Sequence, residues 1–232
     1  MQTIFVYLIA AVGPAAVLMY YVYKKDTVEK EPLDLLIKLV IGGCLSAVVA
    51  GILEQFGIGI LDSMLAPNHP FYVPLLAFLI VAVAEEGAKF FFLYRRSWKR
   101  SEFNYCFDGM VYAIFVSLGF AALENIGYVM GYGIEIAPAR ALLAIPAHMS
   151  FAVYMGYFYG KAKRSALQGN KGGAIANNWK GYLLAVFLHG FYDTCAMIGT
   201  ELASILFIAF VVIVDISVIY MIRRGSKEDE PL

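Results

Sequence analysis

Long apolar runs separated by short polar connections dominate the pattern of the chain. A helix needs about 20 apolar residues to cross a hydrocarbon core of about 30 Å. Runs of that length cover residues 4–23, 35–56, 72–94, 107–130, 138–160, 181–199 and 201–222. The pattern therefore predicts an all-α fold, a polytopic transmembrane helical bundle of about seven spans. It forms one domain over residues 1–224, followed by a short polar tail over residues 225–232.

The longer connections between the runs are predicted to be loops. The stretch from Gly57 to Phe71 contains Gly59, Pro67 and Pro70, so it is too broken for a span and predicts an external loop that begins at the interface. Residues 161–180 are predicted to form the longest polar loop. The first run has full membrane length and its basic residues follow it, so we expect a retained anchor rather than a signal peptide.

Composition agrees with a membrane protein and excludes other classes. Of the 232 residues, 61% are hydrophobic and only 16% are charged, and the mean hydropathy is +0.70. A lipid bilayer is therefore the expected environment. The formal net charge is zero, so nucleic acid is not a predicted partner. The three cysteines are widely spaced and form no CxxC pair, which excludes a disulfide framework and a cysteine-based metal finger.

The basic residues predict the orientation in the membrane. Alternate connections hold 15 of the 18 Lys and Arg residues. These are Lys24, Lys25 and Lys30; Arg95, Arg96, Lys99 and Arg100; Lys161, Lys163, Arg164, Lys171 and Lys180; and Arg223, Arg224 and Lys227. Of the others, Lys38 and Lys89 lie inside predicted helices and Arg140 lies at the outer start of the fifth. Lys and Arg are retained in the cytoplasm, so the N-terminus is predicted outside and the C-terminus inside.

Several ionisable side chains interrupt the predicted spans, where each costs at least about 2.5–3.5 kcal/mol at mid-depth. They are Glu85, Glu86 and Lys89 in the third span, Glu124 beside Asn125 in the fourth, His148 in the fifth, His189 and Asp193 in the sixth, and Asp215 in the seventh. At about 1.5 Å per residue, the Glu85–Glu86 pair, both histidines and Asp193 all fall within about 5 Å of mid-depth. We therefore expect them to converge on one layer.

The spacing of these residues indicates acid–base chemistry. Residues three or four apart share a helix face, as do Glu85 and Glu86 with Lys89, and His189 with Asp193. An Asp one turn from a His can accept its ring proton and fix the tautomer. Two adjacent carboxylates near a lysine in a low dielectric tend to adopt different protonation states.

A structural role is the competing interpretation for each residue. His148 alone could be an interhelical hydrogen-bonding group, and Glu86 could simply neutralise Lys89. Asp215 is expected to make a structural polar contact, and Glu54 and Asp108 to lie at the membrane interfaces. A purely structural interpretation explains poorly why three glutamates and two histidines occur at similar depth.

Three motifs resemble those of the PrsW intramembrane proteases. Glu85 to Lys89 matches EExxK, Phe120 to Asn125 matches FxxxEN, and His189 to Asp193 matches HxxxD, with His148 on the intervening helix. Pro14, Asp26 and the segment Glu29-Lys30-Glu31-Pro32 are also similar to that family. CAAX prenyl proteases and the related bacteriocin-processing proteases share the pattern. Since the CAAX prenyl proteases carry His where this chain has Glu124, PrsW is favoured.

The resemblance implies a bacterial plasma-membrane peptidase that makes the first, site-1, cut in a single-span anti-sigma factor, so that a sigma factor is later released. Hydrolysis needs an activated water, a stabilised oxyanion and a proton for the leaving amine. We assign activation of the water to Glu85 or Glu86. Stabilisation of the oxyanion and protonation of the leaving amine are assigned to His148 and His189. Asp193 would orient His189, while Lys89, Glu124 and Asn125 would support the site.

The residues fit a mechanism with a metal and one without. Glu124, His148 and His189 could supply a Zn²⁺ site of two histidines and one carboxylate. The chain has no HExxH motif, so a metal-free glutamate and histidine mechanism is the alternative.

Two other functions fit the same residues. A proton-coupled transporter or channel could use the buried acids and histidines as a relay, and a non-catalytic membrane adaptor could use them for packing. Transporters often contain two related halves, and no such repeat is visible in the sequence.

Overall fold

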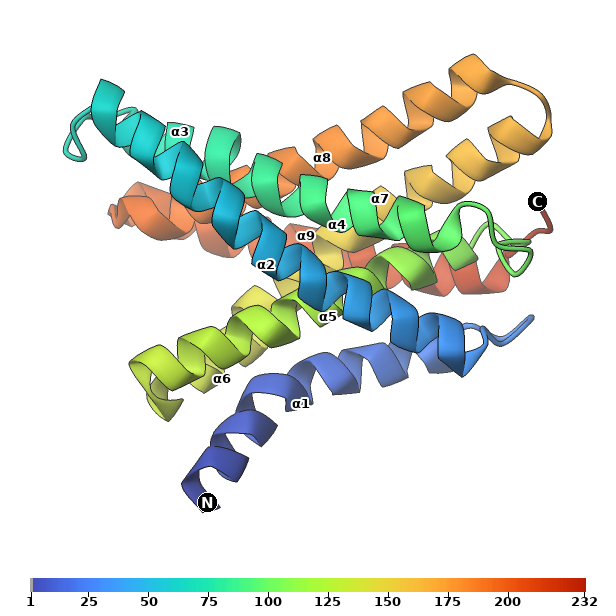
Figure 1. The fold of residues 1–232 in the computed structure, drawn as a ribbon, viewed down its shortest axis with the longest axis horizontal. Helices are drawn as coiled ribbons and strands as arrows, with labels where there is room; N and C mark the ends of the chain where they lie inside the picture. The colour runs from blue at the N-terminus through green and yellow to red at the C-terminus, as the bar shows by residue number, and fades with distance from the viewer. Residues whose placement is uncertain (1) are drawn as a thin grey trace.

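Long helices make up most of the computed structural model, which describes residues 2–232 (Figure 1). Six helical segments in this range are long and apolar enough to cross a membrane. They comprise α1 (Gln2–Lys25), α2 (Leu33–Met64), α5 (Asp108–Tyr132), the segment ending in α7 (Ile145–Leu167), α8 (Lys171–Ile198) and α9 (Glu201–Lys227). The all-helical, multi-pass architecture agrees with the prediction.

The third predicted span is a composite helix. It consists of α3 (Tyr72–Leu75), the π-helical segment η1 (Leu76–Ala82) and α4 (Val83–Ser97). This helix is not among the six apolar segments, and its α4 part carries Glu85, Glu86 and Lys89. Seven spans and the orientation of the termini therefore stay predictions.

A second composite helix leads into α7. After α5 come η2 (Ile134–Ile136), α6 (Ala137–Ala139) and the π-helical segment η3 (Arg140–Ala144). Both π segments thus lie directly before a helix that carries ionisable residues of the predicted site. Such π segments occur frequently at functional sites, because the wider turn changes which side chains face inward.

Two predicted loops are wrong. Helix α2 continues to Met64, so the connection to α3 covers only residues 65–71 rather than all of Gly57 to Phe71. The predicted loop 161–180 is also mostly helical, since α7 ends at Leu167 and α8 begins at Lys171. The Asn170 side chain accepts a hydrogen bond of 2.8 Å from the Gly173 amide and so caps α8. Polar composition marked where helices leave the apolar layer, but not where they end.

Helix α5 forms the centre of the bundle, and α1, α2 and α7 pack directly against it. Glycines allow two of these contacts. A Cβ atom at Gly43 of α2 would overlap the Val116 carbonyl of α5, and one at Gly156 of α7 would overlap the Gly109 carbonyl. Close approach of the backbones brings α7 to α5, as small residues do at many membrane helix interfaces.

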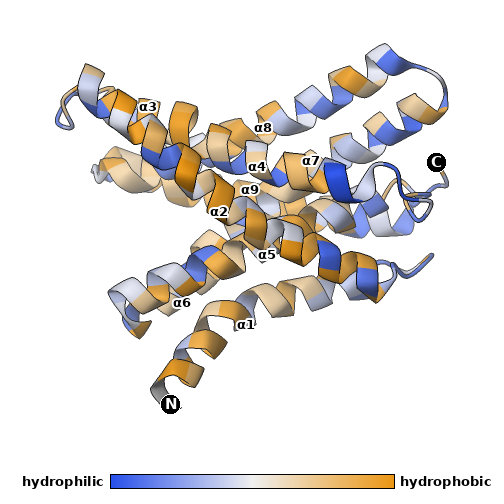
Figure 2. Cartoon of the chain, in the orientation of Figure 1, coloured by the Kyte–Doolittle hydropathy of each residue, from blue (hydrophilic) through white to orange (hydrophobic). Residues whose placement is uncertain are grey.

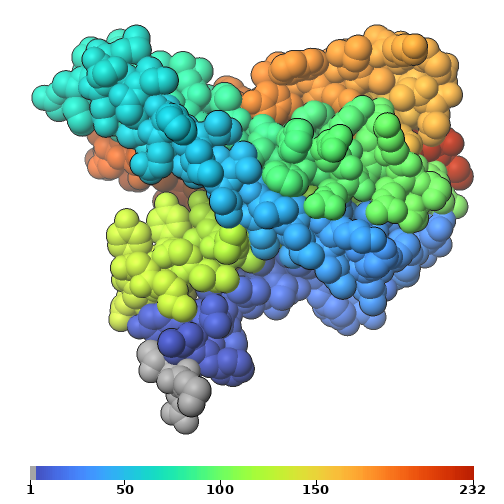
Figure 3. All heavy atoms as spheres, viewed as in Figure 1, coloured from blue at the N-terminus to red at the C-terminus, as the bar shows by residue number. Residues whose placement is uncertain are grey.

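Hydrophobic residues predominate along the middle of the helices, and hydrophilic residues are concentrated at the end of the bundle that holds the C-terminus (Figure 2). Large apolar side chains such as Ile37, Val48 and Leu53 are exposed along α2. In the space-filling view, α2 crosses the face of the molecule diagonally, between α4 and the end of α5 (Figure 3). An exposed apolar belt is what a lipid-facing surface requires.

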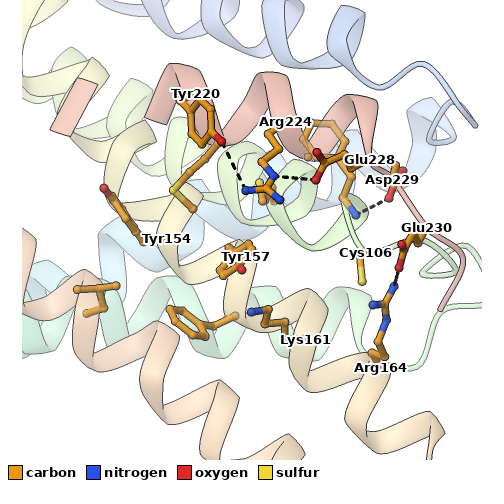
Figure 4. A pocket seen from close by; sticks show the side chains of 16 residues that line it. Cys106, Tyr154, Tyr157, Lys161, Arg164, Tyr220, Arg224, Glu228, Asp229 and Glu230 are labelled. Atoms are coloured by element: carbon orange, nitrogen blue, oxygen red, sulfur yellow. Dashed lines mark hydrogen bonds and ion pairs between the residues drawn. The ribbon is translucent and has the colours of Figure 1, made fainter. Parts of the chain in front are cut away.

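The C-terminal residues 228–232 pack against the connection between α4 and α5. The Cys106 amide donates to the Glu230 carbonyl (3.1 Å), and the Leu232 amide donates to the Asn104 carbonyl (2.8 Å). A cavity of about 610 Å³ lies beside this tail, between α5, α7 and α9 (Figure 4). Its two arginines are paired with the tail, Arg164 with Glu230 and Arg224 with Glu228.

Candidate functional site

The ionisable residues of α4, α7 and α8 meet in the middle of the bundle. Glu85, Glu86, His148 and His189 are all buried, and each places one possible ligand atom within 4.8 Å of the others. The Glu86 Oε1 atom lies 2.9 Å from His189 Nδ1. The Glu85 Oε2 atom lies 4.0 Å from Nδ1 of both histidines. The expected convergence on one layer is therefore present in the structure.

Lys89 lies at the centre of this group. Its Nζ atom is 3.0 Å from Glu85 Oε2, 2.8 Å from Glu86 Oε1 and 3.1 Å from His148 Nδ1. The ammonium also lies 3.9 Å from the centroid of the Phe120 ring. The first two contacts follow directly from the i, i+4 and i, i+3 spacing of EExxK. Lys89 therefore neutralises charge on the glutamates, as the structural interpretation expected, and it contacts His148 as well.

His148 and His189 each have a carboxylate beside Nε2, the ring nitrogen that faces away from the glutamate pair. His148 Nε2 is 3.2 Å from Glu124 Oε2, and His189 Nε2 is 3.3 Å from Asp193 Oδ2. The two rings are perpendicular, with centroids 5.5 Å apart, and Phe151 stacks on His189 at 5.1 Å. The ring orientations are thus fixed from both sides, with both Nδ1 atoms toward the glutamate pair. The predicted contact between Asp193 and His189 is present.

Arg140 is a member of the site that the sequence did not reveal. Its guanidinium pairs with Glu124, donates through Nε to Asn125 Oδ1 (2.6 Å) and lies 3.8 Å from the Tyr128 ring centroid. Asn125 in turn donates to the Ala11 carbonyl of α1 (2.8 Å). Arg140 therefore holds the carboxylate that contacts His148. A signal was present, because Arg140 is the single Lys or Arg in the sequence between Arg100 and Lys161.

A cavity of about 750 Å³ opens onto this group from the side of α7, α8 and α9. Glu85, Glu124, both histidines and Asp193 line it, whereas Glu86 does not. Glu86 Oε2 is buried without a partner among the described residues. Adjacent residues of a helix point in directions that differ by about 100°, which explains why only one of the two glutamates faces the cavity. That residue is Glu85.

Glu54 also lines the cavity, although the sequence placed it at the membrane interface. The difference follows from the length of α2, which continues for ten residues beyond Glu54 to Met64. Asp215 behaves as expected of a structural residue, since it accepts a hydrogen bond of 3.1 Å from Ser150 Oγ.

The comparisons with known proteins point to one family. Residues 31–221 match the family described as "PrsW family intramembrane metalloprotease". The chain is 38% identical to the protease PrsW of Geobacillus kaustophilus over 79% of this chain and 76% of that protein. It is 33% identical to the protease PrsW of Oceanobacillus iheyensis over 94% of this chain and 95% of that protein. The Bacillus subtilis protease PrsW is 33% identical over 79% of each chain. No solved structure matches significantly.

Proposed function

Because this chain belongs to the PrsW family of intramembrane proteases, we propose that it hydrolyses a peptide bond of a single-span membrane protein at the Glu85–His148–His189 group. Family membership implies a membrane-embedded peptidase and favours this activity over transport. The observation that carries the proposal is that Glu85, unlike Glu86, faces the cavity while Lys89 and both histidines lie around it.

Glu85 is the group we assign to the water. Its carboxylate faces the cavity, so a water there can donate a proton to it while the water oxygen attacks the scissile carbonyl. Glu86 is engaged by Lys89 and His189 and has no access to the cavity. Its task is to hold these two residues in place.

His189 and His148 differ in which of their ring nitrogens carry a proton. His189 lies between two carboxylates, which favour a doubly protonated ring that can supply the proton of the leaving amine. His148 accepts from the Lys89 ammonium at Nδ1, so its proton is on Nε2, beside Glu124 at the cavity wall. An N–H at that wall can stabilise the oxyanion.

A metal would find suitable ligands here. Two carboxylates and two imidazoles are donors that catalytic zinc uses, and the outer carboxylates Glu124 and Asp193 match the usual support of ligating histidines. When bound, such an ion polarises a carbonyl and lowers the pKa of a bound water. Lys89 contacts three of the same donors, so it would have to leave His148 Nδ1 for that atom to become a ligand. Glu124, His148 and His189 are the alternative set of zinc ligands.

We further propose that the substrate is an anti-sigma type of protein in a bacterial plasma membrane, and that the cut is the first of a series leading to sigma factor release. Support comes from the resemblance of the three motifs and from the bacterial origin of the PrsW relatives. The alternation of basic connections supports an outside N-terminus.

The test is cleavage by the purified protein in phospholipid vesicles. A single-span anti-sigma substrate tagged at both ends should give two fragments, with the cut mapped by mass spectrometry. The metal content is measured in the same preparation. About one zinc equivalent, with activity lost on chelation and restored by zinc, supports the metal site. Full activity of verified metal-free protein would support the metal-free mechanism, and an intact substrate would reject the proposed function.

A further inference from the structure

We propose that a groove between α2 and α5 is the lateral entrance through which an unwound segment of a membrane-spanning substrate reaches Glu85. The proposal rests on the protease function above and names the route to that same site. The groove is a second cavity, of about 300 Å³, which is bounded by α2 and α5 and is also lined by Glu85.

The two cavities adjoin each other. Glu54, Glu85, Glu124 and Tyr128 line both of them. A chain segment that lies in the groove therefore passes the carboxylate assigned to the water, and its far end can leave into the larger cavity. This shared lining distinguishes the groove from the apolar hollow beside Gly57, whose lining includes none of these four residues.

The groove opens on the exposed apolar side of the bundle. Val48, which is 54% exposed, lies at its edge, and Ala47, Gly51 and Gly127 form its walls. A Cβ atom at Gly51 or Gly127 would meet nothing within 4 Å. Small residues on both helices therefore leave room for a peptide backbone at a place that lipid-embedded segments can reach directly.

The polar lining suits an unwound chain rather than a helix. Hydrolysis requires a substrate segment whose intrahelical hydrogen bonds are broken, and the freed N–H and C=O groups need partners inside a membrane. Glu54 and Glu124 offer acceptors, and the Tyr128 hydroxyl offers a donor. Arg140 lies against the Tyr128 ring and so helps to hold that side of the groove.

Glycine-to-leucine variants test the entrance with matched controls. Gly51→Leu and Gly127→Leu fill the groove, whereas Gly59→Leu and Gly131→Leu place the same side chain on the same two helices outside it. None of the four added Cβ atoms has a neighbour within 4 Å, so all four variants should fold. Each is assayed in vesicles with a tagged single-span anti-sigma substrate, and in detergent with a short soluble peptide containing the same cleavage sequence.

The groove variants should cleave the membrane-spanning substrate at least ~10-fold more slowly than wild type, and the soluble peptide within ~2-fold of wild type. Both control variants should match wild type on both substrates. Equal rates for Gly51→Leu and Gly59→Leu on the spanning substrate would overturn the lateral entrance. Equal losses on both substrates would overturn it too, because the leucine would then act on the centre itself. If wild type cleaves neither substrate, the protease function fails first and the entrance with it.

Discussion

Glu85 and Glu86 are neighbours in the sequence but have different surroundings. Glu85 faces the cavity, and Glu86 is enclosed by Lys89 and His189. Gln keeps the size of Glu but cannot take a proton from water, so Glu85→Gln should lower kcat by ~100-fold or more. The rate of substrate cleavage is measured in membranes where immunoblotting shows normal insertion. Asp215→Asn is the control, since Asp215 lies outside this group and accepts a hydrogen bond from Ser150. A Glu85→Gln enzyme of normal rate would remove Glu85 from the mechanism.

The contact between His189 and Asp193 predicts that substitutions at the two positions slow cleavage to different extents. His189→Ala should abolish cleavage because it removes the proton donor. Asp193→Asn should cause a partial loss of ~10–100-fold, since the ring remains but its Nε2 proton is no longer fixed by a carboxylate. Cleavage rates as a function of pH separate the two roles, because Asp193→Asn should also shift the profile. Equal and complete losses would contradict an orienting role for Asp193.

Arg140 is expected to act through Glu124. Arg140→Gln removes the cation that holds this carboxylate and should lower kcat by ~10–100-fold with little change in KM. Arg140→Lys should recover only part of the rate, because Lys cannot bind Glu124 and Asn125 with a rigid fork. Stability is compared by thermal unfolding in detergent. If Arg140→Lys unfolds like wild type and cleaves fully, charge alone suffices and the positioning role is wrong.

These residues also mark what sequence can and cannot reveal about a site. The periodicity of EExxK and HxxxD was sufficient to pair Lys89 with both glutamates and His189 with Asp193, because those contacts are local to one helix. The contacts of Arg140 and the position of Glu54 depend on which helices pack together and how far α2 continues. No local pattern encodes either.

At the scale of elements, apolar runs located the helices because the membrane imposes their length. Helix ends were predicted less well. Gly57 and Gly59 are tolerated inside α2, and Lys161 and Arg164 lie on a part of α7 that continues past the apolar layer. A polar helix and a polar loop have similar composition, so only packing and capping distinguish them.

The connection between α1 and α2 contains two buried acidic residues, and their raised pKa values predict how the stability of the protein depends on pH. Burial raises the pKa of Asp26 to about 6, against the pull of Lys30. Burial and the neighbouring Asp108 raise the pKa of Glu31 to about 9, with Tyr112 facing the same carboxyl. Both folded-state pKa values exceed the unfolded ones. Their contribution to stability is therefore complete below about pH 4 and is lost as pH rises through 6 and then 9.

Melting temperatures between pH 5 and pH 9 measure this effect. The wild-type value should fall across the range, and Glu31→Gln should flatten the decline because the amide cannot ionise. Glu29→Gln is the control, since Glu29 is an exposed residue of the same connection. A decline of equal slope in Glu31→Gln would show that other groups cause it.

At the scale of the whole molecule, the connections of the bundle fall at two ends. The connection 65–71 and the one at 168–170 lie at opposite ends (Figure 1). The basic connections share the end that holds residue 170 and the C-terminus. Positive charge is retained in the cytoplasm, so that end should face inward.

Thiol labelling in intact cells tests this orientation. The three native cysteines, Cys44, Cys106 and Cys195, are first replaced by alanine, and single cysteines are then placed at Asn68 or Asn170. An impermeant maleimide should label position 68 from outside, and position 170 only after the membrane is permeabilised. The labelling at 170 after permeabilisation is the control for reactivity. The reverse pattern would place the basic end outside and would require the substrate cut to occur from the opposite face of the membrane.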